Sequence, residues 1–75
     1  MKVTVKLFAT LKKDRFSEPS AVDLDDGSTV RDLLEILRID EIDVGILVIN
    51  ARDATFDQKL SAGDSVTIIP PIGGG

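Results

Sequence analysis

The fold of this chain is decided by residues 25–38, DDGSTVRDLLEILR. The first three of these residues are a turn signal. Ser28 or Thr29 then serves as a helix N-cap, and Asp32 follows Thr29 by three residues in a capping-box arrangement. The apolar side chains recur at i, i+3, i+4 and i+7, and they are Val30, Leu33, Leu34 and Leu37. This spacing predicts a helix with one apolar stripe, which packs on a sheet and ends at Arg38 or one residue later.

Two strands are predicted before this helix. Apolar residues alternate with polar ones over residues 2–7, a pattern typical of a half-buried strand. Residues 9–20 break the alternation with a basic cluster and Pro19, so we predict a loop there. Residues 21–24 then form a short second strand, which returns beside the first as a hairpin.

The chain after the helix contains further strand signals. Residues 46–49 are a continuous apolar run, whose length and β-branching favour a strand. Residues 50–53, Asn-Ala-Arg-Asp, predict a hairpin turn, and residues 62–64 a second tight turn before a last strand at 65–69. The order of elements predicts an α+β fold of the β-grasp type, a mixed sheet of four to five strands with one main helix packed on one face. We expect the strand after the helix to lie beside the first strand.

Composition limits the chemistry that the chain can perform. Its 75 residues allow one domain with little room for a separate catalytic cleft. The chain contains neither cysteine nor histidine, which excludes disulfides, zinc–thiolate sites, thiol catalysis and a histidine base. No apolar segment approaches the roughly 18 residues that a membrane-spanning helix needs, so we expect a cytoplasmic protein that does not bind membranes.

The charge distribution indicates the kind of partner. The net charge is −4, which argues against nucleic acid. Residues 1–38 are balanced, whereas residues 39–75 carry six acidic side chains against Arg52 and Lys59. This half predicts a partner with a basic docking surface. The alternative is a solvated acidic surface that serves only solubility.

Residues 70–75, PPIGGG, follow the last strand of the predicted domain, residues 1–69. Proline lacks the N–H that a sheet ladder requires, and a Pro-Pro pair favours an extended conformation that carries the chain away from the body. Three glycines then form a thread without side chains, which could enter a narrow tunnel and place a carboxylate inside another protein. A frayed end or a cloning remnant is the alternative interpretation.

These segments together resemble the small sulfur-carrier subunit of molybdopterin synthase (MoaD) and its relative in thiazole synthesis (ThiS), which share the β-grasp fold with ubiquitin. The resemblance covers essentially the whole chain. Its most specific part combines the tail with a Leu-x-x-Gly-Asp-x-Val turn. The matching segments are residues 5–9, 27–34, 48–50, 60–66 and 68–71, together with Gly74 and Gly75. The long loop after the first strand favours the molybdopterin branch, and Gly73 and Ala51 depart from the usual pattern.

The resemblance implies a carrier, not an enzyme. An ATP-dependent adenylating enzyme of the MoeB/ThiF type would activate the carboxylate of Gly75, and a sulfur donor would convert it to a thiocarboxylate. Gly74 and Gly73 would occupy the tunnel of the partner. A MoaE-type large subunit would be the second partner, in molybdenum or tungsten cofactor synthesis. The resemblance implies that the chain binds no cofactor or metal, because the activating partner uses the ATP. It also implies that the chain alone is a monomer.

Strand parity predicts a docking face on the side of the sheet away from the helix. Side chains that should face the helix are Val3, Val5, Leu7, Leu47, Ile49, Val66 and Ile68. The opposite parity holds Lys6, Phe8, Ile46, Val48, Thr67 and Ile69. Exposed apolar patches commonly mark interfaces, so Phe8, Ile46, Val48 and Ile69, with Ile72 and Gly73 of the tail, are the candidate partner-binding residues. Alternatively, residues 9–20 fold over this face and cover it.

Other functions remain open at this point. The chain could be a ThiS-type carrier, a protein modifier joined through Gly75 to lysines of other proteins, or an interaction module with an inert tail. A carboxylate enzyme built on residues 25–26 or 40–43 is the least favoured, because acidic side chains are ordinary at turns and helix ends.

Overall fold

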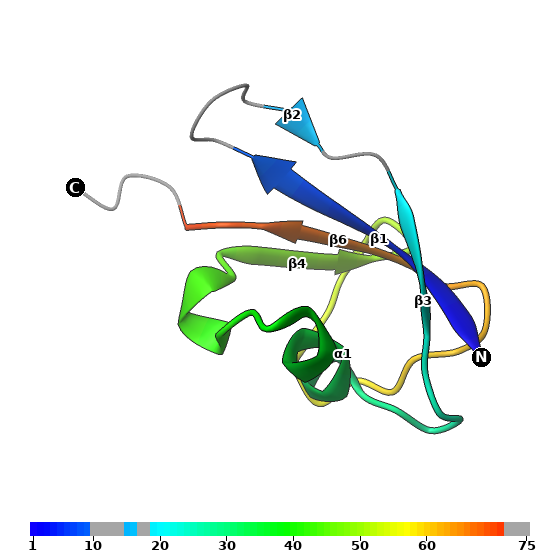
Figure 1. Ribbon diagram of the computed structural model, residues 1–75. Helices are drawn as coiled ribbons and strands as arrows, with labels where there is room; N and C mark the ends of the chain where they lie inside the picture. Colours follow the sequence, from blue (N-terminus) through cyan, green and yellow to red (C-terminus); the bar gives the residue numbers. More distant parts are fainter. Residues whose placement is uncertain (10–14, 17–18, 72–75) are drawn as a thin grey trace.

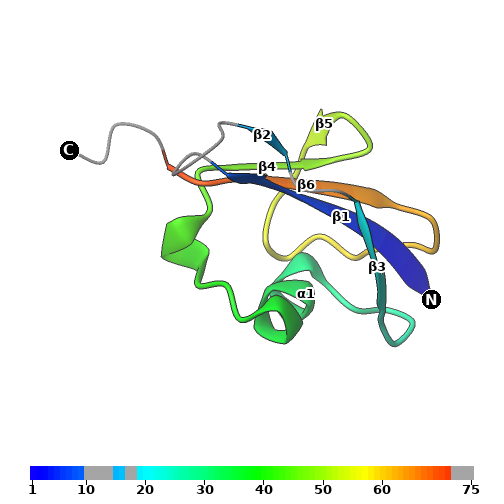
Figure 2. The ribbon, with the colours of Figure 1, turned by 45° about the horizontal axis from the view of Figure 1, so that its top comes forward.

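The computed structural model describes residues 1–9, 15–16 and 19–71. A single sheet carries one α-helix on one face, as Figures 1 and 2 show. In chain order the elements are β1 (Lys2–Ala9), β2 (Arg15–Phe16), β3 (Ser20–Asp23), α1 (Val30–Leu37), the 3-10 helix η1 (Glu41–Asp43), β4 (Ile46–Ile49), β5 (Arg52–Asp53) and β6 (Ser65–Ile69). The α+β fold with a mixed sheet is therefore confirmed, and the short β2 was not predicted.

The order of the strands is β2-β1-β6-β4-β5, with β3 also paired to β1. The predicted hairpin is confirmed, because β1 and β3 pair antiparallel. The prediction that the strand after the helix lies beside the first is wrong: β6 lies between them, parallel to β1 and antiparallel to β4. A helix about 10 Å wide spans roughly two strand spacings of about 4.8 Å, so the crossover through α1 leaves room for another strand.

The core lies between α1 and the sheet. From the helix, Val30, Leu33 and Leu34 are at most 2% exposed, as the apolar stripe predicts. The strand side chains of the predicted helix-facing parity are also buried, with the exception of Leu7, which is 36% exposed. Leu7 pairs with Ile68 on the predicted face, but it is exposed because an eight-residue helix, about 12 Å long, covers only part of an eight-residue strand of about 26 Å.

Both ends of α1 form as the sequence predicts. The Thr29 side chain accepts a hydrogen bond from the Asp32 N–H, and the Asp32 carboxylate accepts one from the Thr29 N–H at 2.9 Å. The helix ends at Arg38 in a left-handed conformation, with φ of 59°. Within the described part of the chain, no helix is long and apolar enough to cross a membrane.

The turns at the start of β6 are tied together by polar side chains. Asn50 and Ala51 have φ of 52° and 66°, the positive values that a tight two-residue hairpin requires. The Asn50 amide donates to Asp64 and accepts from the Ser65 N–H, both at 2.9 Å. Asp64 also accepts from the Ser61 N–H at 2.8 Å. The Gly-Asp turn of the resemblance is thus a structural device, located at the end of β6 remote from the tail.

An arginine connects α1 to the segments that follow it. Arg31 donates through Nε to Glu41 of η1 at 2.8 Å, and through a guanidinium N–H to Asp57. These bonds, that to Glu41 first, raise the pKa of Arg31 above its usual range. The guanidinium also lies 6.0 Å from the centre of the Phe56 ring. Arg31 is part-exposed and connects η1 to the helix.

The capping box provides a stability test. Replacing Thr29 by alanine removes the side-chain oxygen that accepts the Asp32 N–H, and we expect the free energy of unfolding to fall by about 1 kcal/mol. Urea denaturation followed by circular dichroism measures this change. Ser28→Ala, one residue outside the cap, is the matched control and should change stability by less. Equal losses for the two variants would contradict the assignment of Thr29 as the N-cap.

Candidate functional site

The candidate site begins where the chain leaves the sheet. β6 ends at Ile69, whose carbonyl accepts a hydrogen bond of 2.8 Å from the Gly45 N–H. Pro70 follows and has no N–H to continue the ladder. Figure 1 shows that this exit lies at the same end of the sheet as η1 and the end of β1. The predicted tail residues Ile72, Gly73, Gly74 and Gly75 lie outside the described residues.

The candidate docking residues lie on adjacent strands beside this exit. Ile46 of β4 pairs with Ile69 of β6, and one residue beyond the Leu7–Ile68 pair comes Phe8 of β1. These three side chains therefore form a row across the sheet at its exit end. The next row holds Val48 and Lys6, each paired with Thr67. The structure thus brings all four apolar candidates of the docking face together.

The docking face is apolar and accessible in its described part. Ile46 is 45% exposed, and Phe8, Val48 and Ile69 are part-buried. Figure 2 shows α1 on the other side of the sheet. In the alternative interpretation, residues 9–20 cover this face. Most of that segment lies outside the described residues. The described part of that segment, β2, pairs along the outer edge of β1 and extends the sheet.

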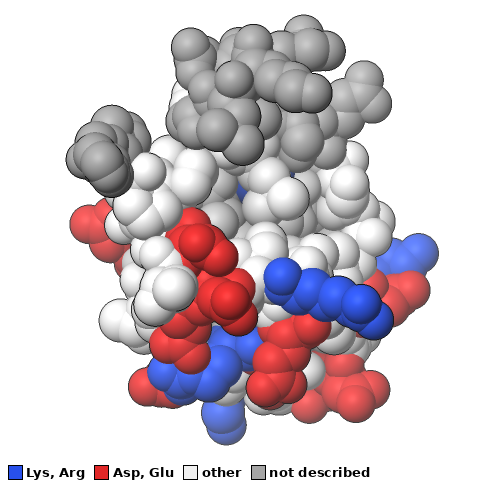
Figure 3. Space-filling model, turned by 60° about the vertical axis from the view of Figure 1, so that its left-hand side comes forward, with Lys and Arg blue, Asp and Glu red and all other residues white. Residues whose placement is uncertain are grey.

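One apolar side chain near the exit was missed in the sequence. Ile42 on η1 is 83% exposed, three residues before Gly45, and the acidic Asp40, Glu41 and Asp43 surround it in the sequence. An apolar residue within an acidic stretch was the available signal. Figure 3 looks at this end of the molecule and shows an uncharged surface with acidic and basic side chains below it. Such a face suits a partner that offers apolar groups with basic groups at the edge.

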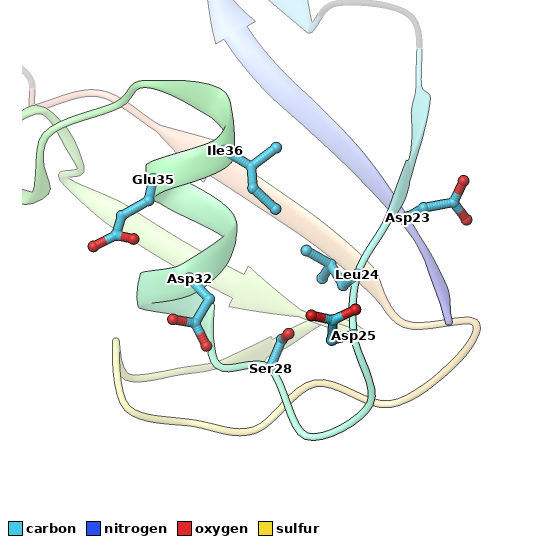
Figure 4. Close-up of a pocket in the computed structure, with 7 residues that line it drawn as sticks. All are labelled: Asp23, Leu24, Asp25, Ser28, Asp32, Glu35 and Ile36. Atoms are coloured by element: carbon cyan, nitrogen blue, oxygen red, sulfur yellow. The ribbon is translucent and has the colours of Figure 1, made fainter.

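Among the described residues, the acidic side chains do not gather into a group of potential metal ligands. A hollow of about 590 Å³ lies between β3 and α1. Asp25, Asp32 and Ser28 are among the residues that line it (Figure 4). The carboxylates of Asp23 and Glu35 at its two sides point away from each other. Asp26 lies 3.8 Å from the N-terminal amine. Within the described residues, no group of three potential metal ligands gathers, so the geometry gives the carboxylate-enzyme alternative no support.

Comparison with known proteins adds independent evidence. The chain is similar to SAMP1, the small archaeal modifier protein 1 of Haloferax volcanii, at 26% identity over 100% of both chains with a TM-score of 0.73. It is similar to a putative molybdopterin converting factor subunit 1 from Pyrococcus furiosus at 30% identity, covering 95% of this chain and 98% of that one, with a TM-score of 0.71.

A further solved structure contains a second subunit. In the complex of subunits 1 and 2 of the molybdopterin-converting factor from Helicobacter pylori 26695, the similar chain is 25% identical over 100% of both chains, with a TM-score of 0.66. No curated protein matches the sequence. The model of the ThiS family matches residues 5–75 and so includes both the docking face and the tail. The chain therefore belongs to the ThiS family, within the ubiquitin-like sulfur carriers of the ThiS/MoaD type.

Proposed function

We propose that this chain is a cytoplasmic sulfur carrier of molybdopterin synthesis and that Gly75 carries the thiocarboxylate. The observation that supports this most strongly is the family match, which extends through Gly75. In this chain the central strand is followed by Pro70-Pro71 beside an apolar face. The likeness to a molybdopterin converting factor subunit favours that pathway over thiazole synthesis.

The proposed chemistry needs no catalytic side chain in the carrier. A carboxylate is a poor electrophile, so an oxygen of the Gly75 carboxylate first attacks the α-phosphate of ATP, and pyrophosphate leaves. The persulfide sulfur of the donor then displaces AMP from the acyl carbon. Reduction of the resulting acyl disulfide by a thiol leaves the thiocarboxylate on Gly75. All acid–base groups and metals are supplied by the partners, which agrees with a chain that lacks histidine and cysteine.

Two partners follow from this proposal. The first is an adenylating enzyme of the MoeB/ThiF type, which would receive the docking face and draw Gly73, Gly74 and Gly75 into its active site. The second is a MoaE-type large subunit, a proposal supported by the two-subunit complex of the Helicobacter relative. Both partners would pack against the apolar side chains of the docking face, because the tail starts next to these side chains.

Conjugation to other proteins is the second candidate function, and the likeness to SAMP1 favours it. Sulfur transfer and conjugation share the same acyl-adenylate, so the described structure is compatible with both. The two functions differ in the nucleophile that attacks the activated Gly75: sulfur in one, a lysine amine in the other. Conjugates that survive denaturing electrophoresis would identify the modifier.

Mass spectrometry of the intact chain tests the carrier function. After incubation with ATP, an adenylating enzyme of this type, a persulfide donor and a thiol, we expect a gain equal to the mass difference between one sulfur and one oxygen atom. Fragmentation should place this change on Gly75. The matched control lacks Gly74 and Gly75 and should gain no sulfur. A wild-type chain that forms neither adenylate nor thiocarboxylate would overturn the proposal.

The docking face is tested by Val48→Asp. A carboxylate at position 48, one row from the apolar side chains at the exit, must be desolvated on binding, so we expect the KM of the adenylating enzyme for the carrier to rise about tenfold, as for an interface hot spot. Thermal denaturation checks that the domain stays folded. Ile36→Asp is the matched control, because Ile36 is 56% exposed on α1, on the other side of the sheet. An unchanged KM for Val48→Asp would show that the partner binds elsewhere.

A further inference from the structure

Gly45 lies against the backbone at the base of the tail. A Cβ atom built on Gly45 would lie 2.7 Å from both the Cα and the N of Pro71, and 2.9 Å from the carbonyl carbon of Pro70. Real Cβ atoms essentially never approach other atoms so closely. The neighbours are backbone atoms, which cannot rotate away as the end of a side chain can. Only glycine therefore fits at this position while residues 70–71 stay where they are.

Backbone conformation does not explain the glycine at position 45. Gly27 and Gly63 have φ of 85° and 86°, and a Cβ built on either would meet nothing within 4 Å. These two glycines serve their turns. Gly45 is not among the residues with positive φ. A residue with a side chain could therefore adopt the same backbone conformation. The close approach of Pro70 and Pro71 is what requires glycine here.

Gly45 is itself held from both sides. Its N–H donates to the Ile69 carbonyl at 2.8 Å, which fixes it to the end of β6. On the other side, the Val44 N–H donates to the Glu41 carbonyl at 3.1 Å, and the Glu41 side chain accepts from Arg31. The wall that Gly45 forms beside the tail is therefore anchored to β6 and, through η1, to α1.

The tail is stiff where it touches this wall. Each proline ring fixes its own φ near −65°, and Pro71 also restricts the conformation of Pro70. A direction imposed at Pro70 is therefore kept as far as Pro71. An added methyl group at position 45 would therefore displace this rigid segment.

We propose that Gly45 is a positioning residue, which sets the direction in which the tail leaves the sheet and so aims the terminal carboxylate at the active site of the adenylating partner. This inference rests on the proposed function. It adds a residue that belongs to neither the tail nor the docking face. Its signature is a carrier that docks normally but reacts slowly.

The test is Gly45→Ala in the full chain, with pyrophosphate exchange catalysed by the adenylating enzyme. We expect kcat to fall by about ten- to a hundredfold, the loss that a misplacement near 1 Å causes, and KM for the carrier to stay close to the wild-type value. Val48→Asp should show the opposite split. Gly63→Ala is the matched control: it strains a positive-φ turn and lowers stability but lies at the other end of β6, so kcat should stay unchanged.

A second measurement does not depend on the partner. In nitrogen–proton correlation spectra, Gly45→Ala should shift the amide signals of Ile69 and Ile72, whereas Gly63→Ala should leave both unchanged. A wild-type kcat for Gly45→Ala, or a loss that Gly63→Ala reproduces, overturns the inference. If the wild-type chain is not adenylated at all, the proposed function fails. The spectra then decide the placement of the tail alone, and unmoved Ile69 and Ile72 signals overturn it.

Discussion

The parallel pairing of β1 with β6 is the constraint on which the rest of the structure depends. It places the last strand of the sheet in the middle, with β1 on one side and β4 on the other. Both edges of β6 are hydrogen-bonded to neighbouring strands, and Val66 and Ile68, on the side that faces the helix, are at most 3% exposed. The tail consequently starts from a strand that is paired on both edges instead of from a fraying edge strand. The same pairing brings Phe8 and Ile46 to the two sides of the exit.

The two ends of β6 have different tasks. At its start, Asn50, Ser61 and Asp64 satisfy the polar groups of two turns and fix where the strand begins. At its end, proline stops the ladder and apolar side chains flank the exit. Much of the resemblance to sulfur carriers therefore lies in residues that build the turn. The residues suited to partner binding are ordinary strand residues that differ from others only in their position on the sheet.

The features that could be predicted from the sequence are those that depend on neighbours in the chain. The Thr29–Asp32 capping box, the Asn50–Ala51 turn and the alternation of buried residues in the strands are all local, and the structure confirms them. The central place of β6 was not predictable in this way, because it depends on pairing between residues some sixty positions apart. The exposure of Leu7 depends on how far the helix reaches, which no strand pattern encodes.

The residues of the candidate site also separate into those that a local pattern predicts and those that depend on distant contacts. Parity alone identified Phe8, Ile46, Val48 and Ile69 as one face, and the register brings them together beside the exit. Gly45 could not be recognised from its neighbours in sequence, where it is only the residue before an apolar run. Its role follows from contact with Pro71, which lies 26 positions later in the chain. The exposed Ile42 differs from Gly45, because an apolar residue within an acidic stretch is a local signal.

The central place of β6 also has a consequence during synthesis of the protein. Until residues 65–69 have left the ribosome, β1 and β4 have no strand between them and the sheet cannot close. The base of the tail, Gly45 against Pro71, forms only after that closure. A nascent, truncated or misfolded chain therefore lacks the surface from which a tail could be presented. Closure of the sheet therefore precedes presentation of the tail.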